Sequence, residues 1–86
     1  MRYHVEFTSA AARQVKKLSR PTRERVLSAA EALAANPRPQ GSRKLVGEQR
    51  AWRIRIGEYR IIYEIFDDSL TVTVVRAAHR REVCRK

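Results

Sequence analysis

The N-terminal part of the chain changes from an alternating pattern to a helical one. Apolar and polar residues alternate over residues 3–8, which is typical of a half-buried strand. Thr8 or Ser9 then has the chemistry of a helix N-cap, and apolar residues recur at helical spacing as far as about Leu18. The pattern predicts a strand followed at once by a short helix.

A second helix is expected after a very short connection. Pro21 suits the first turn of a helix, where its missing N–H does no harm. The helix ends near Asn36, because Pro37 disfavours helical geometry in the residue before it. Apolar residues of this segment form one stripe: Val26, Leu27, Ala30, Leu33 and Ala34.

The C-terminal half predicts a loop and three strands. Residues 37–50 contain two of the three prolines and two of the three glycines, and so are expected to form a loop. Strands follow at residues 52–56, 59–66 and 70–75, with short turns between them. The result is a single α+β domain over residues 1–86 in the order β-α-α-β-β-β. We expect an antiparallel sheet with the two-helix hairpin packed on one face.

Strict alternation in residues 52–56 gathers basic side chains. The apolar members of this strand face the helices, whereas Arg53 and Arg55 face the other side. Arg60 can lie on that same side across the tight hairpin. Like charges placed opposite each other cost stability, so three such arginines indicate a phosphate-binding surface. The alternative is that they only cover the solvated face of an amphipathic strand.

The charge balance supports a polyanionic partner. The chain has 19 Lys and Arg against 9 Asp and Glu, which gives a formal net charge of +10. Nucleic acid, an anionic membrane surface and an acidic protein all fit such a charge. Fifteen of the basic residues are arginine, which favours two-pronged binding of phosphate.

Other residue types limit the chemistry. Cys84 is the single cysteine, so the chain has no internal disulfide and no cysteine-based zinc site. The presence of only two histidines argues against a metal cluster, and no apolar run approaches the roughly 20 residues of a membrane span. We expect a cytoplasmic protein that uses no metal and no cofactor.

Residues 76–86 are the most densely basic part of the chain. They follow directly from the last predicted strand, so their start is anchored beside the sheet. Histidine is the residue type most often used as a general base, which makes His79 a candidate, and an arginine such as Arg80 stabilises the charge of a phosphoryl transition state. The alternative for this segment is a solvated terminus.

Three segments together resemble the RelE family of the RelE/ParE toxin superfamily. They are Lys44-Leu45-Val46-Gly47, residues 52–65, which include YRIIY at residues 59–63, and residues 79–83, which read HRREV. The resemblance covers nearly the whole chain, including its length and the order of its elements. YRIIY and HRREV in this order are fairly specific, although each alone is weak.

The resemblance implies a toxin that enters the ribosomal A site and cuts messenger RNA. In such an mRNA interferase the 2′-hydroxyl attacks the neighbouring phosphate and leaves a 2′,3′-cyclic phosphate, without a metal. Arg53, Arg55 and Arg60 match basic positions on the family's strands. Arg80 matches the basic residue after the last strand, which is the candidate for assisting the leaving oxygen. Further RNA contacts are expected from Lys44, Arg76, Arg81 and Arg85.

One position departs from the family pattern. Many members have a catalytic tyrosine where this chain has Cys84. A thiol whose pKa is lowered by nearby arginines can act as a base, and His79 is the other candidate base. If neither serves, the protein is a weakened nuclease that mainly blocks the A site.

The resemblance also implies partners and leaves alternatives open. It implies an acidic, RelB-like antitoxin, contact with operator DNA only through that antitoxin, and no membrane. A ParE-like inhibitor of DNA gyrase is the second interpretation, although ParE-like members generally lack the basic catalytic set. The third interpretation is a non-enzymatic module that binds RNA or the antitoxin.

Overall fold

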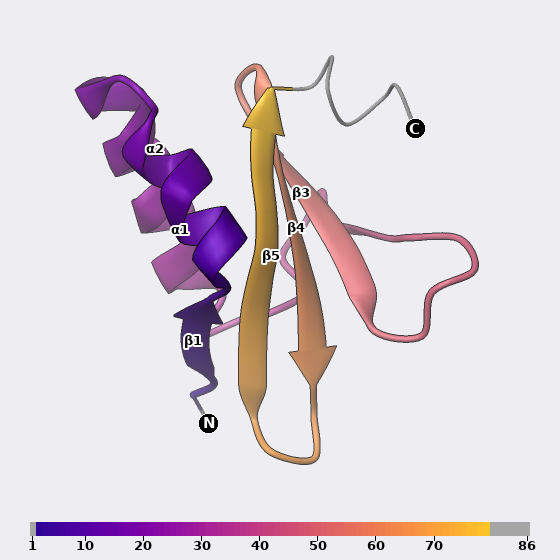
Figure 1. Ribbon diagram of the computed structural model, residues 1–86. Helices are drawn as coiled ribbons and strands as arrows, with labels where there is room; N and C mark the ends of the chain where they lie inside the picture. Colours follow the sequence, from indigo (N-terminus) through magenta and orange to yellow (C-terminus); the bar gives the residue numbers. More distant parts are fainter. Residues whose placement is uncertain (1, 80–86) are drawn as a thin grey trace.

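Two helices cover one face of a five-stranded sheet in the computed structural model, which describes residues 2–79 (Figure 1). The α+β class is confirmed, and a short strand is added inside the predicted loop. The elements in chain order are β1 (His4–Phe7), α1 (Ser9–Lys16), α2 (Arg20–Ala32), β2 (Arg43–Lys44), β3 (Ala51–Ile56), β4 (Tyr59–Phe66) and β5 (Thr71–His79).

The sheet is mixed, not purely antiparallel as the sequence suggested. Its order is β1-β5-β4-β3-β2, and β1 lies parallel to β5 with Val5 opposite Val72. The other three pairs are antiparallel. Alternation shows which residues of a strand share a face, but it does not show which strand lies beside it. The first strand therefore could not be placed from its pattern.

A bulge in β5 reverses the faces of its last residues. Tyr63 lies opposite Val74, whereas Ile62 lies opposite Arg76, so Val75 is an extra residue in the ladder. Before the bulge Val74 points toward the helices. After it Ala77 does so, and Arg76 points to the open face of the sheet. The last strand also runs beyond the predicted residues 70–75.

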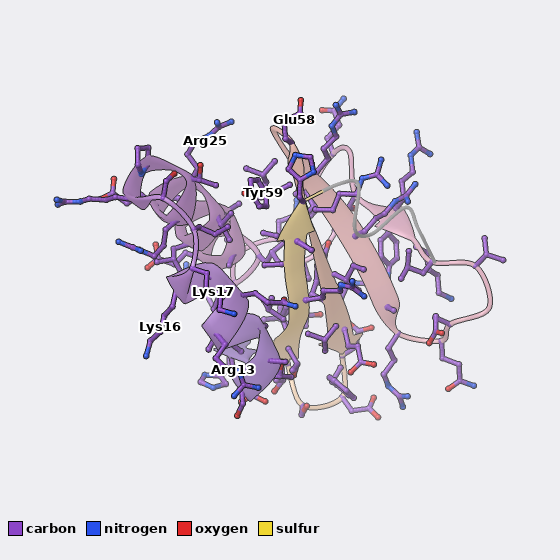
Figure 2. The ribbon with its side chains drawn as sticks, turned by 45° about the horizontal axis from the view of Figure 1, so that its top comes forward. Arg13, Lys16, Lys17, Arg25, Glu58 and Tyr59 are labelled. Atoms are coloured by element: carbon purple, nitrogen blue, oxygen red, sulfur yellow. The ribbon has the colours of Figure 1, made fainter. Side chains whose placement is uncertain are left out.

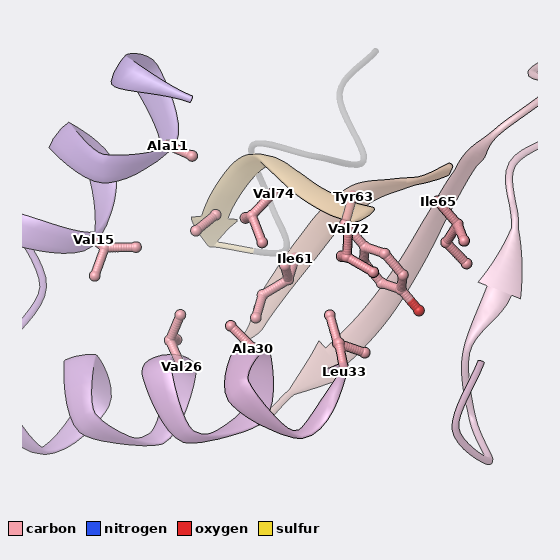
Figure 3. Packing of buried hydrophobic residues seen from close by; sticks show 11 residues of the cluster. Ala11, Val15, Val26, Ala30, Leu33, Ile61, Tyr63, Ile65, Val72 and Val74 are labelled. Carbon is pink, nitrogen blue, oxygen red and sulfur yellow. The ribbon is translucent and has the colours of Figure 1, made fainter. Parts of the chain in front are cut away.

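The helices are held to the sheet by apolar packing (Figure 3). Tyr63, Ile61 and Leu33 are fully buried at the centre of this contact. At the free edge of β5, the Gln14 side-chain carbonyl accepts a hydrogen bond from the Ala77 backbone N–H at 2.8 Å. The buried cluster comprises Ala11, Val15, Val26, Ala30, Leu33, Ile61, Tyr63, Ile65, Val72, Val74 and Ala77.

The predicted N-cap of the first helix is confirmed. Thr8 has extended backbone geometry, and its hydroxyl accepts a hydrogen bond from the Ala11 backbone N–H at 3.1 Å. Pro21 lies in the first turn of α2, as expected. α2 ends at Ala32, and the chain continues in turns toward Pro37, whose carbonyl accepts a hydrogen bond from the Tyr63 hydroxyl at 2.8 Å.

Replacing this cap is expected to destabilise the domain. Thr8→Ala leaves a backbone N–H of α1 without its acceptor, which costs about 1 kcal/mol. Urea unfolding measures the change, with Thr8→Ser as the matched control because serine keeps the acceptor. Equal stability of the alanine and serine variants would show that the cap contributes nothing.

Candidate nucleic-acid interface

The arginines of β3 and β4 meet on the face of the sheet away from the helices. Arg55 lies directly opposite Arg60, and Arg53 lies opposite Ile62. Side chains of directly paired residues share a face, so the three arginines stand together. Gly57 makes the tight turn between the strands possible, because its φ of +59° is unfavourable for residues with a side chain.

A fourth arginine joins them from β2, and the sequence pattern did not reveal it. Arg43 lies opposite Arg53 and therefore on the same face. Arg43, Arg53, Arg55, Arg60 and Gly41 line a depression of about 250 Å³, which we call the arginine hollow. A strand of two residues carries no readable period, so nothing in the sequence distinguished Arg43 from the rest of its loop.

Lys44 does not belong to this surface. It lies opposite Trp52, so its side chain is on the other side of the sheet from Arg53. The structure therefore separates Lys44 from the arginines, and its contact with RNA stays a prediction. Successive residues of a strand point to opposite faces, so its neighbour Arg43 is the β2 residue that lies on the arginine side.

Arg76 shares the open face because of the bulge in β5. It lies opposite Ile62, which itself lies opposite Arg53. Its Nε is buried and has no hydrogen-bond partner within residues 2–79. Buried donors without an acceptor are uncommon and often mark functional positions. The structure thus puts Arg76 on the same face as the arginine hollow, and its contact with RNA stays a prediction.

His79 lies away from the arginine hollow. It is opposite Tyr59, and the two rings meet edge to face with centroids 5.5 Å apart. Tyr59 belongs to the side of the sheet that faces α2, together with Arg25 (Figure 2). The structure therefore places His79 on the other side of the sheet from the arginines, and its role as a base stays a prediction. The bulge is the reason, because without it His79 would face the other way.

The remaining predicted residues cannot be placed. Arg80, Arg81, Cys84 and Arg85 lie outside the described residues 2–79. The described part therefore includes Arg53, Arg55 and Arg60 of the predicted catalytic set and His79, but not Arg80 or Cys84.

The open face has a gradient of charge along its strands. Within residues 2–79, no carboxylate forms a salt bridge with Arg43, Arg53 or Arg55. Two carboxylates lie toward the other end of these strands. Glu64 is opposite Thr73, and the Thr73 hydroxyl donates a hydrogen bond to Glu6 at 3.3 Å. A polyanion is therefore attracted to the hairpin end of β3 and β4 and repelled from the acidic end.

The described residues do not offer a metal site. No group of three or more His, Cys, Asp or Glu side chains gathers in residues 2–79. In the same residues, no helix is long and apolar enough to cross a membrane.

The loop that delivers Arg43 is fastened to the β4–β5 turn. The Arg38 guanidinium donates to both oxygens of Asp67, at 2.9 and 3.4 Å, and the Tyr3 hydroxyl donates to Asp67 at 2.6 Å. Arg38 also lies over the Trp52 ring, 5.4 Å from its centroid. Hydrogen bonds from Arg38 and then Tyr3 lower the pKa of Asp67 below its usual value of 3.8.

This lowered pKa predicts acid sensitivity of the loop anchor. A carboxylate with a lowered pKa in the folded state stabilises the fold above its unfolded pKa and loses that contribution as the pH falls below it. Asp67→Asn is therefore expected to flatten the fall in unfolding free energy below about pH 4. Urea unfolding at a series of pH values tests this, with Asp68→Asn as the control. The idea fails if both variants lose stability in acid as the original protein does.

Three comparisons with known proteins agree with this geometry. The model of the family described as the ParE toxin of the type II toxin–antitoxin system parDE matches residues 5–84. Toxin RelG of Mycobacterium tuberculosis is 34% identical over 94 residues, covering 100% of both chains. The putative toxin RelE1 of Methanocaldococcus jannaschii is 27% identical, covering 95% of this chain and 93% of the relative.

A solved structure shows the same fold. It is the toxin–antitoxin complex RelBE2 from Mycobacterium tuberculosis, with a TM-score of 0.83 and 32% sequence identity. The match covers 93% of each chain. The similarity thus extends over nearly the whole chain.

Proposed function

This chain belongs to the RelE family of the RelE/ParE superfamily of type II toxins, and from that premise we propose that it cleaves messenger RNA on the ribosome. The observation that carries the proposal is the arginine hollow. Four guanidinium groups on one open face are costly for a fold unless they bind an anion. Guanidinium groups match the oxygens of a phosphodiester and stay charged at every physiological pH.

The proposed reaction needs no group beyond the RNA and the protein. The 2′-oxygen forms a bond to the adjacent phosphorus, and the bond from phosphorus to the 5′-oxygen breaks. The products are a 2′,3′-cyclic phosphate and a 5′-hydroxyl. The arginines stabilise the charge that gathers on the phosphate oxygens during the transfer.

Two protons must move in this reaction. A base takes one from the 2′-hydroxyl, and an acid gives one to the leaving 5′-oxygen. Arg80 is the proposed partner of the leaving oxygen, on the strength of the family resemblance. Cys84 is the proposed base, because it stands where many members have a catalytic tyrosine and nearby arginines can lower the pKa of a thiol. The position of His79 behind the sheet favours Cys84 over it.

A cognate antitoxin is the proposed partner. The similar RelBE2 structure is a toxin–antitoxin complex. For this chain, with its net charge of +10, we expect an acidic RelB-like protein whose own DNA-binding part provides the only contact with operator DNA. The proposed place of action is the cytoplasm, where translating ribosomes are found.

Controlled expression tests the proposed function. Growth arrest with new 5′ ends in translated messages, mapped by primer extension, is the expected result. Cys84→Tyr restores the residue common in the family and is expected to increase cleavage. A decrease in that variant would mean that the thiol has a role of its own, and arrest without cleaved messages would contradict the nuclease.

Gyrase inhibition is the second candidate, because the matching family model is described as the ParE toxin. Arg53, Arg55 and Arg60 of the hollow argue against it, since ParE-like members generally lack the catalytic basic set to which these three and Arg80 belong. The two functions separate in the same culture. DNA synthesis that stops before protein synthesis, with relaxed plasmids and intact messages, would favour gyrase.

A further inference from the structure

A second hollow lies at the far end of the same strands. It has a volume of about 310 Å³, which is within the range of small-ligand sites, and its walls include Arg38, Arg50, Trp52, Phe66, Asp67 and Asp68. We call it the tryptophan hollow. Its lining differs from that of the arginine hollow, so it is suited to a different part of a ligand.

Flat stacked surfaces are its first distinguishing feature. The Arg38 guanidinium lies 5.4 Å from the centroid of the Trp52 ring, and that of Arg50 lies 5.2 Å from the centroid of Phe66. Aromatic rings and guanidinium planes are the surfaces on which unpaired nucleobases stack in RNA-binding proteins. The hollow therefore offers two such surfaces.

Its charge is the second feature. Two arginines and two aspartates cancel, whereas the arginine hollow is lined by four arginines and no carboxylate. A phosphate gains little from a neutral hollow, and carboxylate oxygens repel it. A neutral base avoids this repulsion and can donate its N–H groups to a carboxylate.

Asp68 is the carboxylate that remains available. Both oxygens of Asp67 already accept hydrogen bonds: Oδ1 from Tyr3 and Arg38, and Oδ2 from Arg38. Within residues 2–79, the exposed Asp68 side chain has neither a hydrogen bond nor an ion pair. Two parallel N–H donors bind a carboxylate best, and guanine is the base that presents two adjacent ones on its Watson–Crick edge.

The two hollows border the same strand and the same loop. Trp52 and Arg53 are consecutive residues of β3, while the loop between α2 and β3 contributes Gly41 and Arg43 to one hollow and Arg38 and Arg50 to the other. Trp52 faces the helix side of the sheet, whereas Phe66 lies on the open face with Arg60, because the residues that alternate with them in β4 are buried toward the helices. Phe66 is about 20 Å along β4 from Arg60, at roughly 3.3 Å per residue. A few nucleotides of single-stranded RNA span that distance.

We propose that the tryptophan hollow binds a guanine base of the RNA whose phosphate is held in the arginine hollow. This inference rests on the proposed function, because it takes RNA as the substrate. It makes Asp68 a specificity-determining residue, and it makes Arg50 and Phe66 a stacking surface for the base.

Trp52 provides a direct readout, since it is the single tryptophan of the chain. Guanosine 5′-monophosphate contains no phosphodiester bond and cannot be cleaved, so it is a suitable probe for the intact protein. We expect it to quench Trp52 fluorescence saturably, and uridine 5′-monophosphate to bind more weakly. Asp68→Asn is expected to raise the Kd for the guanosine nucleotide about tenfold, the loss of one charge-assisted contact.

Two matched variants separate this site from general charge and from folding. Glu48→Gln removes one exposed carboxylate elsewhere in the loop and should leave the Kd unchanged. Phe66→Leu keeps an apolar side chain but removes the aromatic ring, and should weaken binding of both nucleotides. Thermal unfolding of each variant establishes that the fold is retained.

The outcomes distinguish this inference from the proposed function. The inference would be overturned if the guanosine nucleotide did not change Trp52 fluorescence, or if the Asp68→Asn variant bound it with the same Kd. RNA cleavage by the same protein would still support the proposed function. Guanosine binding through Asp68 in a protein that cuts no message would support the hollow and defeat the nuclease.

Discussion

The double variant Arg55→Ala/Arg60→Ala is expected to lose RNA cleavage by a factor of at least about 10² to 10³, the usual effect of removing a donor to a charged transition state. These two side chains are directly opposite each other across β3 and β4. They are one of two pairs of directly opposed arginines in the arginine hollow, the other being Arg43 and Arg53. Their loss removes both the grip on the phosphate and the stabilisation of its developing charge.

The same variant is expected to keep its fold. Arg55 and Arg60 lie outside the buried cluster, and replacing two like charges that face each other relieves repulsion. The Arg55 Nε donates to the Gly57 carbonyl at 3.1 Å, which offsets part of that gain. Unfolding free energy should therefore change by less than about 1 kcal/mol, as for most surface substitutions.

Arg13→Ala/Lys16→Ala is the matched control for this result. It removes the same two positive charges from α1, where both side chains project from the helix layer (Figure 2). Cleavage of a short RNA in the test tube and the salt dependence of its binding should be compared for the two variants. If the control loses as much cleavage as the sheet variant, overall charge and not the hollow is responsible.

The salt dependence adds a second readout. For single-stranded RNA, each phosphate that the variant no longer neutralises makes the slope of log affinity against log salt shallower by roughly 0.7. The Arg55→Ala/Arg60→Ala protein should therefore show a shallower slope than the original protein.

Tyr63→Ala is expected to produce the largest loss of stability, about 3–5 kcal/mol, as for other large aromatic residues removed from a core. Tyr63 is 0% exposed and lies at the centre of the buried cluster between the helices and the sheet. In a domain of this size such a loss approaches the whole free energy of folding. The variant should be largely unfolded at physiological temperature.

Tyr63→Phe tests the hydrogen bond separately. Burial raises the pKa of the Tyr63 hydroxyl, which stays protonated and donates to the Pro37 carbonyl at 2.8 Å. Its removal leaves that carbonyl without this donor, at a cost of about 1–2 kcal/mol. Calorimetry should show a folded protein with a midpoint lower by roughly 4–8 °C for each kcal/mol. A midpoint equal to that of the original protein would show that this bond does not fasten the loop.

Local pattern was sufficient for most of the architecture. Alternation located β3 and β4, the N-cap at Thr8 was identified by its chemistry, and Pro21 correctly opened α2. The same alternation brought Arg53, Arg55 and Arg60 to one face, because a tight hairpin sets the register of the two strands it joins.

The sequence pattern could not assign the face of a side chain where that face depends on pairing with a strand elsewhere in the chain. Arg43 lies on the open face and Lys44 on the other because β2 exists only through its pairing with β3. His79 lies on the side of the sheet that faces α2 because one extra residue in β5 reverses the faces of the residues after it. A bulge of this kind has no signature in a run of apolar and small residues.

The amino-acid sequence by itself determined the class of fold, the positive charge and the shared face of the three hairpin arginines. Each of these follows from residue type and from contacts close in the chain. Only the tertiary structure decided that β1 lies parallel to β5, that Arg43 and Arg76 join the open face, and that Asp68 stands beside Trp52 and Phe66. These depend on contacts between segments far apart in the chain, whose free energy belongs to the assembled sheet and not to any one segment.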